Sequence, residues 1–356
     1  MGNVIIKQHN DNFEKPMYYN YNWILSKNRM FNIIVGLRGG GKTYGATSLI
    51  IDRFLKFGYK AIWMRRLATE IDKVFLSQFF KDMEEKYKDY EFGVDFTDVI
   101  GMAYGKIRER KKDSEWQRFI LFMPLSISLK HKSVVMNEFN LIICDEWFID
   151  TMHSNLRYIN GWNEPQTFYE FFESVVRTRD DVKVIFISNA FSSVNPYFSE
   201  WGIKIDKDTE WWINDFICVH NYRNNTYKEV KEQTKWGQFM SGTRYGKYNM
   251  ENEFLLDNND FIEQKSEDSK WAFNIYFLNE TWGVWVDVKN SKIFISDKIN
   301  DTGMTYCFTT EDMKPNLLLI DRLKTTPSNR IAMTISKAFK HSYLYFANQE
   351  IKPTIP

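Results

Sequence analysis

The fold is decided by residues 31–43, which read FNIIVGLRGGGKT. A short apolar run predicts a buried strand, and the pattern G-x-x-x-x-G-K-T follows it directly. Glycine has no Cβ, so successive backbone N–H groups of such a loop can curl around a phosphate. The run at 44–57 is suited to a helix, whose N-terminus would add its positive dipole end at Lys42. Because a strand precedes the motif and a helix follows it, the alternative of a chance glycine-rich turn is disfavoured.

The motif assigns roles to its residues. Lys42 is expected to contact the β- and γ-phosphates of a nucleotide, and the Thr43 hydroxyl is expected to bind Mg²⁺. The residues predicted to bind the nucleotide from this segment are Gly36, Arg38, Gly39, Gly40, Gly41, Lys42, Thr43 and Tyr44. An aromatic group upstream, at 18–23, either packs beside the base or fixes the chain to the edge of the domain.

A second landmark lies at 140–146, NLIICDE, where an apolar run ends in two acids. Buried parallel strands have this composition, and ligands bind at their carboxyl ends. Asp145 is therefore predicted to hold Mg²⁺ through water, and Glu146 to polarise the attacking water. The strand expected between the two landmarks, at 60–66, and the adjacent glutamate indicate the additional-strand, catalytic-glutamate (ASCE) branch of P-loop ATPases. ATP and Mg²⁺ are the predicted cofactors.

The remaining N-terminal segments complete an α/β domain with a mostly parallel sheet. Thr69 is predicted to cap a helix that continues to Met83, and 165–176 predicts an amphipathic helix with its phenylalanines inward. A further apolar strand at 181–187 ends in two polar residues beside the expected γ-phosphate position. The second of them, Asn189, is a candidate γ-phosphate sensor, and a strand-end cap is the alternative.

Changes in composition divide the chain into three predicted parts, an ATPase domain at 1–221, a linker subdomain at 222–260 and a C-terminal domain at 261–356. The basic residues of the linker either meet a phosphate backbone or form a solvated face. Hairpin patterns followed by a helix predict an RNase H-like α+β fold for the last part. A nuclease of that fold needs several carboxylates on divalent metals. Asp287 alone lies within the expected strands, so we predict a vestigial nuclease domain without cleavage activity.

Bulk properties exclude several classes of protein. A formal charge of +1 over 356 residues excludes a globally basic nucleic-acid coat, so a nucleic-acid contact would be a confined surface. Three cysteines without C-x-x-C or histidine pairing argue against zinc sites and disulfides. No apolar run approaches the length of a membrane span, and no secretory h-region is present at the start. We expect a soluble cytosolic protein without a membrane partner.

Several strings resemble, in order, the DNA packaging ATPases of the phi29-like small tailed phages. They are VGLRGGGKTYG, WMRR, ICDEW, VVRTRDDV, ISNAFSSVNPYF, SGTRYG and FIEQKSEDSKWAFNIYF with GVWVDV. ISNAFSSVNPYF and GVWVDV carry most weight, because they have no role common to all ATPases. The resemblance implies a ring motor, a homo-oligomer that is usually five-membered, which docks on the portal vertex of an empty procapsid through a structural RNA. It would drive double-stranded DNA inward, in the host cell cytoplasm, and be absent from the mature virion.

The family pattern also implies roles outside the two landmarks. Arg177 matches the arginine that is supplied in trans to the neighbour's γ-phosphate, and a helix-C-terminal arginine that binds carbonyls is the alternative. Lys132 matches a further catalytic residue at the subunit interface. The family often carries another basic residue where this chain has Leu67-Ala68, so a DNA-gripping or trans-acting role could fall to Arg66.

Two alternatives belong to other functional classes. A terminase-like ATPase with an active nuclease domain would nick DNA with Mg²⁺ or Mn²⁺. A helicase-like ATPase, or a nucleotide-switched binding module, would respond to single-stranded rather than duplex DNA.

Overall fold

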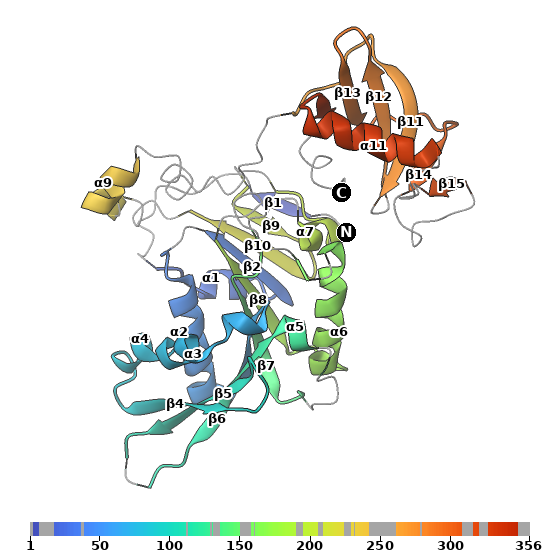
Figure 1. The fold of residues 1–356 in the computed structure, drawn as a ribbon. Coiled ribbons are helices and arrows are strands. Elements are labelled where there is room, and N and C mark those ends of the chain that lie inside the picture. The colour runs from blue at the N-terminus through green and yellow to red at the C-terminus, as the bar shows by residue number, and fades with distance from the viewer. Residues whose placement is uncertain are drawn as a thin grey trace. The chain divides into compact units, whose positions relative to one another are not determined.

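The computed structural model contains two compact units, Met1–Leu256 and Asp257–Pro356, which are described separately here (Figure 1). The structure describes residues 3–6, 18–36, 39–111, 113–128, 130, 136–149, 158–159, 161–189, 195–205, 209–223, 229–230, 232–241, 261–277, 280–307, 316–319 and 327–347.

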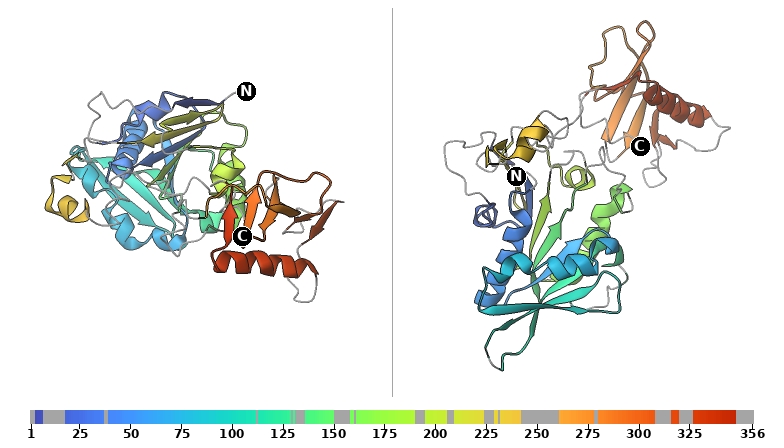
Figure 2. Two further views of the ribbon diagram at one scale, coloured as in Figure 1. Left: turned by 90° about the horizontal axis from the view of Figure 1, so that it is seen from above. Right: turned by 60° about the vertical axis from the view of Figure 1, so that its left-hand side comes forward.

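A ten-stranded sheet forms the centre of the first unit, in the order β1-β9-β10-β2-β8-β7-β3-β6-β5-β4 (Figures 1 and 2). Its strands are β1 (Val4–Ile6), β2 (Phe31–Gly36), β3 (Lys60–Arg65), β4 (Tyr90–Phe96), β5 (Ala103–Glu109), β6 (Gln117–Pro124), β7 (Phe139–Asp145), β8 (Lys183–Ser188), β9 (Trp211–Ile213) and β10 (Ile217–Tyr222). From β10 to β6 all neighbours are parallel, whereas the strands at both edges pair antiparallel. The predicted mostly parallel sheet is confirmed.

Helices cover both faces of the parallel strands. They are α1 (Asn22–Leu25), α2 (Lys42–Phe57), α3 (Lys73–Gln78), α4 (Lys81–Glu84), α5 (Leu125–Ser128), α6 (Glu164–Val176) and α7 (Pro196–Glu200). The buried residues of α2 share one core cluster with Ile34 and Ile143, and those of α6 share the other with Ile33 and Ile142. Consecutive strand residues thus face opposite cores, because side chains alternate along a strand. The sheet is buried on both faces, as its near-continuous apolar strands predict.

The prediction of one continuous helix from Thr69 to Met83 is wrong. A 3-10 turn, Ala68–Glu70, is followed by two separate short helices, α3 and α4. Asp72 caps α3 by accepting a hydrogen bond from the Phe75 N–H at 2.7 Å, and a capped start interrupts the helix before it. Val74, at the start of α3, is 68% exposed.

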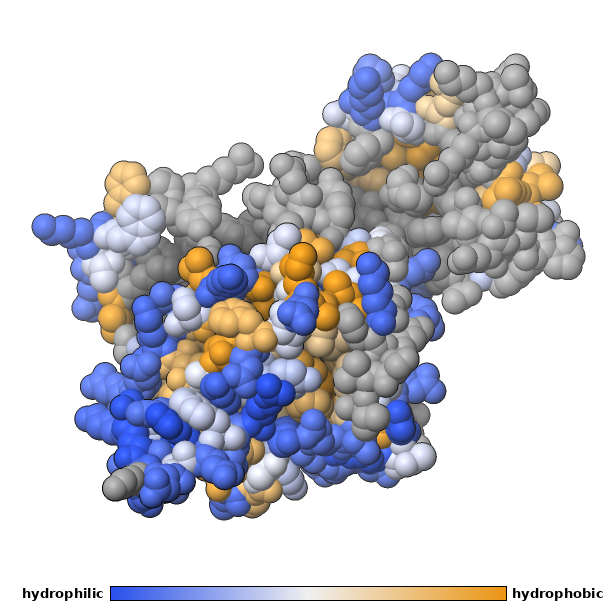
Figure 3. Space-filling view, turned by 60° about the horizontal axis from the view of Figure 1, so that its bottom comes forward, coloured by the Kyte–Doolittle hydropathy of each residue, from blue (hydrophilic) through white to orange (hydrophobic). Residues whose placement is uncertain are grey.

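Charged side chains on the antiparallel edge of the sheet are paired with one another. Asp95 contacts Lys106 at 2.5 Å and Arg118 at 3.0 Å, and Glu91 contacts Arg108 at 2.5 Å. Hydrophilic residues dominate this end of the first unit in Figure 3. Such exposed ion pairs add little stability, but they neutralise the basic side chains of β5 and β6.

The second unit contains a six-stranded sheet in the order β15-β14-β11-β12-β13-β16. Its elements are β11 (Lys270–Phe277), β12 (Glu280–Asp287), β13 (Lys292–Ser296), β14 (Thr305–Cys307), β15 (Leu317–Leu319), α11 (Pro327–Lys340) and β16 (Leu344–Phe346). The three antiparallel strands β11–β13 and the helix are confirmed, within an RNase H-like arrangement. Two strands that the sequence did not reveal, β14 and β15, precede α11 and extend the sheet in parallel from β11.

The predicted linker contains α9 (Lys235–Ser241), and the division of the chain at 221/222 and 260/261 remains a prediction. Among the residues that the structure describes, no helix combines the length and apolar character needed to cross a membrane.

Candidate active site

The loop after β2 leads directly into α2, whose N-cap is Gly41. Gly39 and Gly41 have φ angles of 88° and 72°, in the left-handed region that favours glycine. A Cβ on Gly41 would lie 2.5 Å from Cδ1 of Tyr18, and one on Gly36 would lie 2.8 Å from the carbonyl oxygen of Tyr222. These glycines are therefore required for backbone conformation and close packing as well as for the approach of a phosphate.

Lys42 lies at the first position of α2 and is 6% exposed. Its Nζ donates hydrogen bonds to the Gly36 carbonyl at 2.8 Å and to Oδ1 of Asn189 at 3.1 Å. Asn189 reaches this position because β8, which it follows, pairs directly with β2. Two neutral oxygens therefore help to hold the ammonium group of Lys42 at the N-terminus of α2, where its positive charge can meet a phosphate.

Asp145 ends β7, the neighbour of β8 in the sheet. Its side chain is 1% exposed, and Oδ1 accepts a hydrogen bond from Oγ1 of Thr43 at 3.3 Å. Hydroxyl and carboxylate oxygens are the ligands that Mg²⁺ prefers, so this pair at a helix N-terminus fits a magnesium–nucleotide complex. Burial raises the pKa of Asp145, and the positive charge of Arg65 opposes that rise.

Arg65, the last residue of β3, contacts both acids of the second landmark. Its Nη2 lies 2.6 Å from Oδ2 of Asp145, and its Nη1 lies 2.9 Å from Oε2 of Glu146. Burial alone would lower the pKa of Arg65, but the two carboxylates raise it. From the sequence, Arg65 is predicted only to lie near the end of a strand. The signal that could have revealed it is a basic residue at the carboxyl end of the strand beside the Asp-Glu strand.

Glu146 follows β7 with φ of 52°, an uncommon conformation for a residue other than glycine. The next residue, Trp147, donates its backbone N–H to the Ile187 carbonyl at 3.1 Å, so the chain turns sharply over β8. The Glu146 side chain is 51% exposed, in contrast to buried Asp145. A positive φ at a single polar residue beside a cleft is a form of backbone strain found at functional sites.

These groups line one cleft with a volume of about 870 Å³. It contains the P-loop residues Lys42 and Thr43, the two acids and Asn189. The rings of Tyr18 and Tyr44 also line it, with centroids 6.0 Å apart. A cavity of this size accommodates a nucleotide. Of the predicted binding residues, Arg38 lies outside the described part of the chain.

Arg177 is not brought to this cleft. It is exposed and follows α6, and within the described residues its side chain makes no hydrogen bond or ion pair. Arg179, two residues on, donates to the carbonyls of Asn137 and Phe139 at the amino end of β7, the sheet edge opposite the cleft. Arg177 thus lies near the edge remote from its own cleft, and carbonyl binding falls to Arg179. Lys132 lies outside the described residues.

Arg66 corrects an expectation. It is 2% exposed and forms an ion pair with Glu164, at 2.6 Å between Nη2 and Oε2. A buried, paired guanidinium is not placed to grip DNA or to reach a neighbouring subunit. The sequence could not show this, because Glu164 lies almost a hundred residues after Arg66 in the chain.

Strand β2 and helix α2 flank the P-loop, and β8 lies between β2 and β7 in the sheet. Together with the Asp-Glu pair at the carboxyl end of β7, this arrangement defines the additional-strand, catalytic-glutamate class of P-loop ATPase folds. The model of the podovirus DNA encapsidation protein (Gp16) family matches residues 13–355. The chain belongs to this family.

Individual relatives are similar to this protein over nearly the whole chain. The DNA packaging protein of Bacillus phage phi29 is 32% identical over 341 residues, covering 95% of this chain and 96% of its own. That of Bacillus phage B103 is 29% identical over 327 residues, covering 92% and 95%. The solved bacteriophage phi29 viral genome packaging motor assembly matches with a TM-score of 0.71 at 29% identity, covering 95% of this chain and 97% of the matched chain.

Proposed function

We propose that this protein hydrolyses ATP with Mg²⁺ and uses the energy to drive double-stranded DNA into a preformed procapsid. One observation carries the proposal: Lys42, Thr43, Asp145 and Glu146 meet in a single cleft of a chain that belongs to the DNA encapsidation family. Each has the chemistry and position that phosphoryl transfer requires.

Each of these residues has a separate role in hydrolysis. Lys42 neutralises the β- and γ-phosphates, and Asn189 fixes its ammonium group next to them. Thr43 and Asp145 would hold Mg²⁺, which when bound neutralises charge that develops on the phosphates. Glu146 accepts the proton of the attacking water once its contact with Arg65 opens.

A second subunit completes the site. Arg177 would contact the γ-phosphate bound by a neighbour, which fits its exposed position near the edge remote from its own cleft. Lys132 is proposed at the same interface. We infer a homo-oligomeric ring of five subunits, the number usual in the family that the sequence resembles. The ring would contact the portal of the procapsid, directly or through structural RNA, in the host cell cytoplasm.

The contact with DNA should be mainly to phosphates, so it would be independent of sequence and sensitive to salt. The second unit is proposed to lack nuclease activity. Asp287, the last residue of β12, accepts hydrogen bonds from the Ser266 hydroxyl at 2.6 Å and from Asn290 Nδ2 at 2.9 Å. Its oxygens are thus occupied by protein donors. In the described residues no group of three or more acids, histidines or cysteines is placed to hold a metal.

The test is ATP turnover by the full-length protein with and without procapsids and duplex DNA. Wild type should be stimulated by procapsid plus duplex, and Glu146→Gln should lose about a hundredfold or more of this turnover, the usual contribution of a general base. Glu91→Gln, on an exposed ion pair outside the cleft, is the matched control. Turnover indifferent to procapsid and DNA would contradict the packaging function. Normal turnover by Glu146→Gln would contradict the catalytic assignment.

A further inference from the structure

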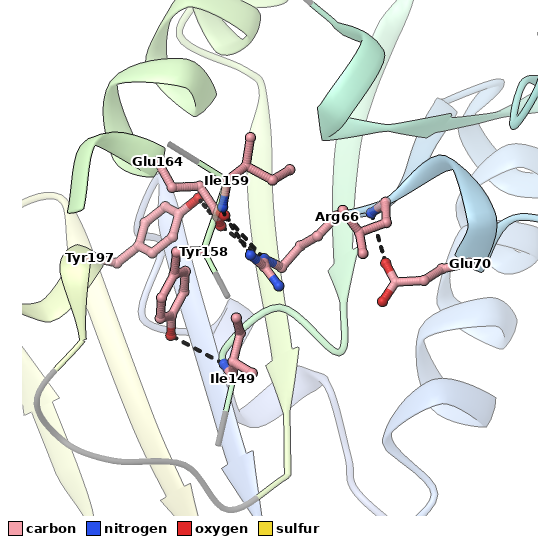
Figure 4. A network of polar contacts seen from close by, with 8 residues as sticks. Arg66, Glu70, Ile149, Tyr158, Ile159, Glu164 and Tyr197 are labelled. Carbon is pink, nitrogen blue, oxygen red and sulfur yellow. Dashed lines mark hydrogen bonds and ion pairs between the residues drawn. The ribbon is translucent and has the colours of Figure 1, made fainter. Parts of the chain in front are cut away.

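Arg65, the last residue of β3, and Arg66, which follows it, have different partners. Arg65 contacts the carboxylates of the nucleotide site, whereas the side chain of Arg66 reaches Glu164, the first residue of α6 (Figure 4). Successive side chains of a strand point to opposite faces, so a single strand end touches both the site and the helix. Helix α6 then runs to Val176, and Arg177 follows immediately.

The contact between Arg66 and Glu164 is closely defined. Nε of Arg66 lies 2.9 Å from Oε1 of Glu164, and Nη2 lies 2.6 Å from Oε2, the two-point geometry that makes guanidinium–carboxylate pairs directional. The two side chains are 2% and 0% exposed. Movement of either partner away from the other would separate two buried charges, which is strongly destabilising.

Glu164 has further donors from two other segments. The Tyr197 hydroxyl, on α7, donates to Oε1 at 3.1 Å, and the backbone N–H of Ile159 donates to Oε2. The ring of Tyr158 lies 4.9 Å from the Arg66 guanidinium, and the Tyr158 hydroxyl accepts the Ile149 N–H at 3.1 Å. This polar cluster therefore joins the end of β3, the chain just after the catalytic acids and the start of α6 (Figure 4).

Stability alone does not account for such a cluster. Replacing a buried ion pair by apolar side chains of similar volume is often neutral or stabilising, whereas breaking it by removing one partner is strongly destabilising. What the pair provides is a fixed geometric relation between β3 and α6. That relation is useful only if the position of α6 matters to the reaction.

We propose that Arg66 and Glu164 are positioning residues that couple helix α6, and with it Arg177, to the catalytic acids. When Arg65 releases Glu146, the end of β3 shifts, and the Arg66–Glu164 pair carries that shift into the start of α6. A helix of this length is rigid and about 20 Å long, so a small shift at its start is reproduced at its end. This inference rests on the proposed function, in which Arg177 acts on a neighbour's nucleotide.

The experiment compares full-length variants in the ATPase assay with procapsids and duplex DNA. Arg66→Met combined with Glu164→Leu removes the coupling but avoids an unpaired buried charge. This double variant leaves the Tyr197 hydroxyl and the Ile159 N–H without their acceptor, so it should unfold at a lower temperature than the wild type. At a temperature where it is folded, it should keep KM for ATP within about threefold and lose about tenfold or more in kcat. Arg108→Met with Glu91→Leu, which removes an ion pair outside the cleft, should leave kcat unchanged.

Combining the double variant with Arg177→Ala distinguishes coupling through Arg177 from a merely structural role of the pair. If the pair acts through Arg177, the triple variant should be no slower than Arg177→Ala alone, because coupled residues are not additive. Wild-type kcat in the double variant, or fully additive losses in the triple variant, would overturn the inference and leave the proposed function intact. Normal turnover by Arg177→Ala would overturn both the trans-acting assignment and the coupling. If the double variant fails to fold, Glu164→Gln, which keeps the carbonyl acceptor, should show the same loss of kcat and the same non-additivity.

Discussion

Replacing Arg65 by methionine should make the binding of Mg²⁺ more sensitive to acid than it is in the wild type. Arg65 is the cation that compensates buried Asp145, at 2.6 Å between Nη2 and Oδ2. Two unit charges about 4 Å apart interact by about 4 kcal/mol at an effective dielectric constant of about 20. Loss of an interaction of this size should raise the pKa of Asp145 further above its ordinary value, since burial then acts on the carboxylate without the opposing charge of Arg65.

The direction of the effect follows from the charge of the group. Burial already raises the pKa of Asp145, and loss of Arg65 removes the nearby charge that opposes the rise. Only the ionised carboxylate binds Mg²⁺ well, and its ionised fraction falls as the pH drops through the pKa. In Arg65→Met the loss of Mg²⁺ affinity should therefore begin at higher pH than in wild type.

The assay is the Mg²⁺ concentration that gives half-maximal binding of a fluorescent ATP analogue, measured across a series of pH values. Below the raised pKa this concentration should increase about tenfold per pH unit in the methionine variant. Arg65→Lys, which keeps a positive charge, is the control and should shift the curve less. The same pH dependence in wild type and Arg65→Met would refute the assignment of Arg65 as the compensating charge.

Three further changes test the described geometry. Gly41→Ala should lower the free energy of unfolding by about 1–3 kcal/mol and weaken ATP binding, because the new Cβ meets a tyrosine ring at a positive φ. Gly58→Ala, which has nearly the same φ but open space around it, should lower the free energy of unfolding by about 1 kcal/mol and leave ATP binding unchanged. Equal losses of the two variants in denaturant titrations would contradict this reasoning. Asn189→Ala should lower kcat about tenfold with an intact fold, and unchanged steady-state kinetics would reject its contact with the P-loop lysine as functional. Hydrogen bonds from Ser266 and Asn290 lower the pKa of Asp287 to about 2, so the contribution of Asp287 to stability is present above its unfolded pKa and is lost as the pH falls toward 2. Asp287→Asn should therefore lower the melting temperature more at neutral pH than at acid pH. The variant should leave metal-dependent DNA cleavage assays unchanged, and a change in cleavage would argue for a nuclease role.

The parts of the site that the sequence predicted are those in which neighbours in the chain are also neighbours in space. Lys42 and Thr43 belong to a loop whose conformation is set by its own glycines. Asp145 and Glu146 end an apolar strand, and parallel strands deliver their carboxyl ends to one edge. Strand type and edge were therefore enough to place these four residues together.

The parts that were missed depend on strand order and on distant partners. Arg65 meets the two acids because β3 pairs with β7, and no local pattern specifies that pairing. A DNA-gripping or trans-acting role was a prediction for Arg66, and only its buried partner Glu164 argues against that role. The helix expected at 69–83 is divided because Asp72 begins a new capped helix. The Asp72 side chain binds a backbone N–H, and this hydrogen bond competes with the continuation of a helix through that position.

The placement of two arginines on opposite sides of one strand end has a consequence for how this segment tolerates change. Insertion or deletion of one residue in β3 would exchange the faces of the following side chains, because the pleat has a period of two. Arg65 would then point toward α6 and Arg66 toward the acids, and both contacts would be lost at once. Homologous chains and engineered variants should therefore vary in the residues of β3 but keep its length unchanged between Lys60 and the arginine pair.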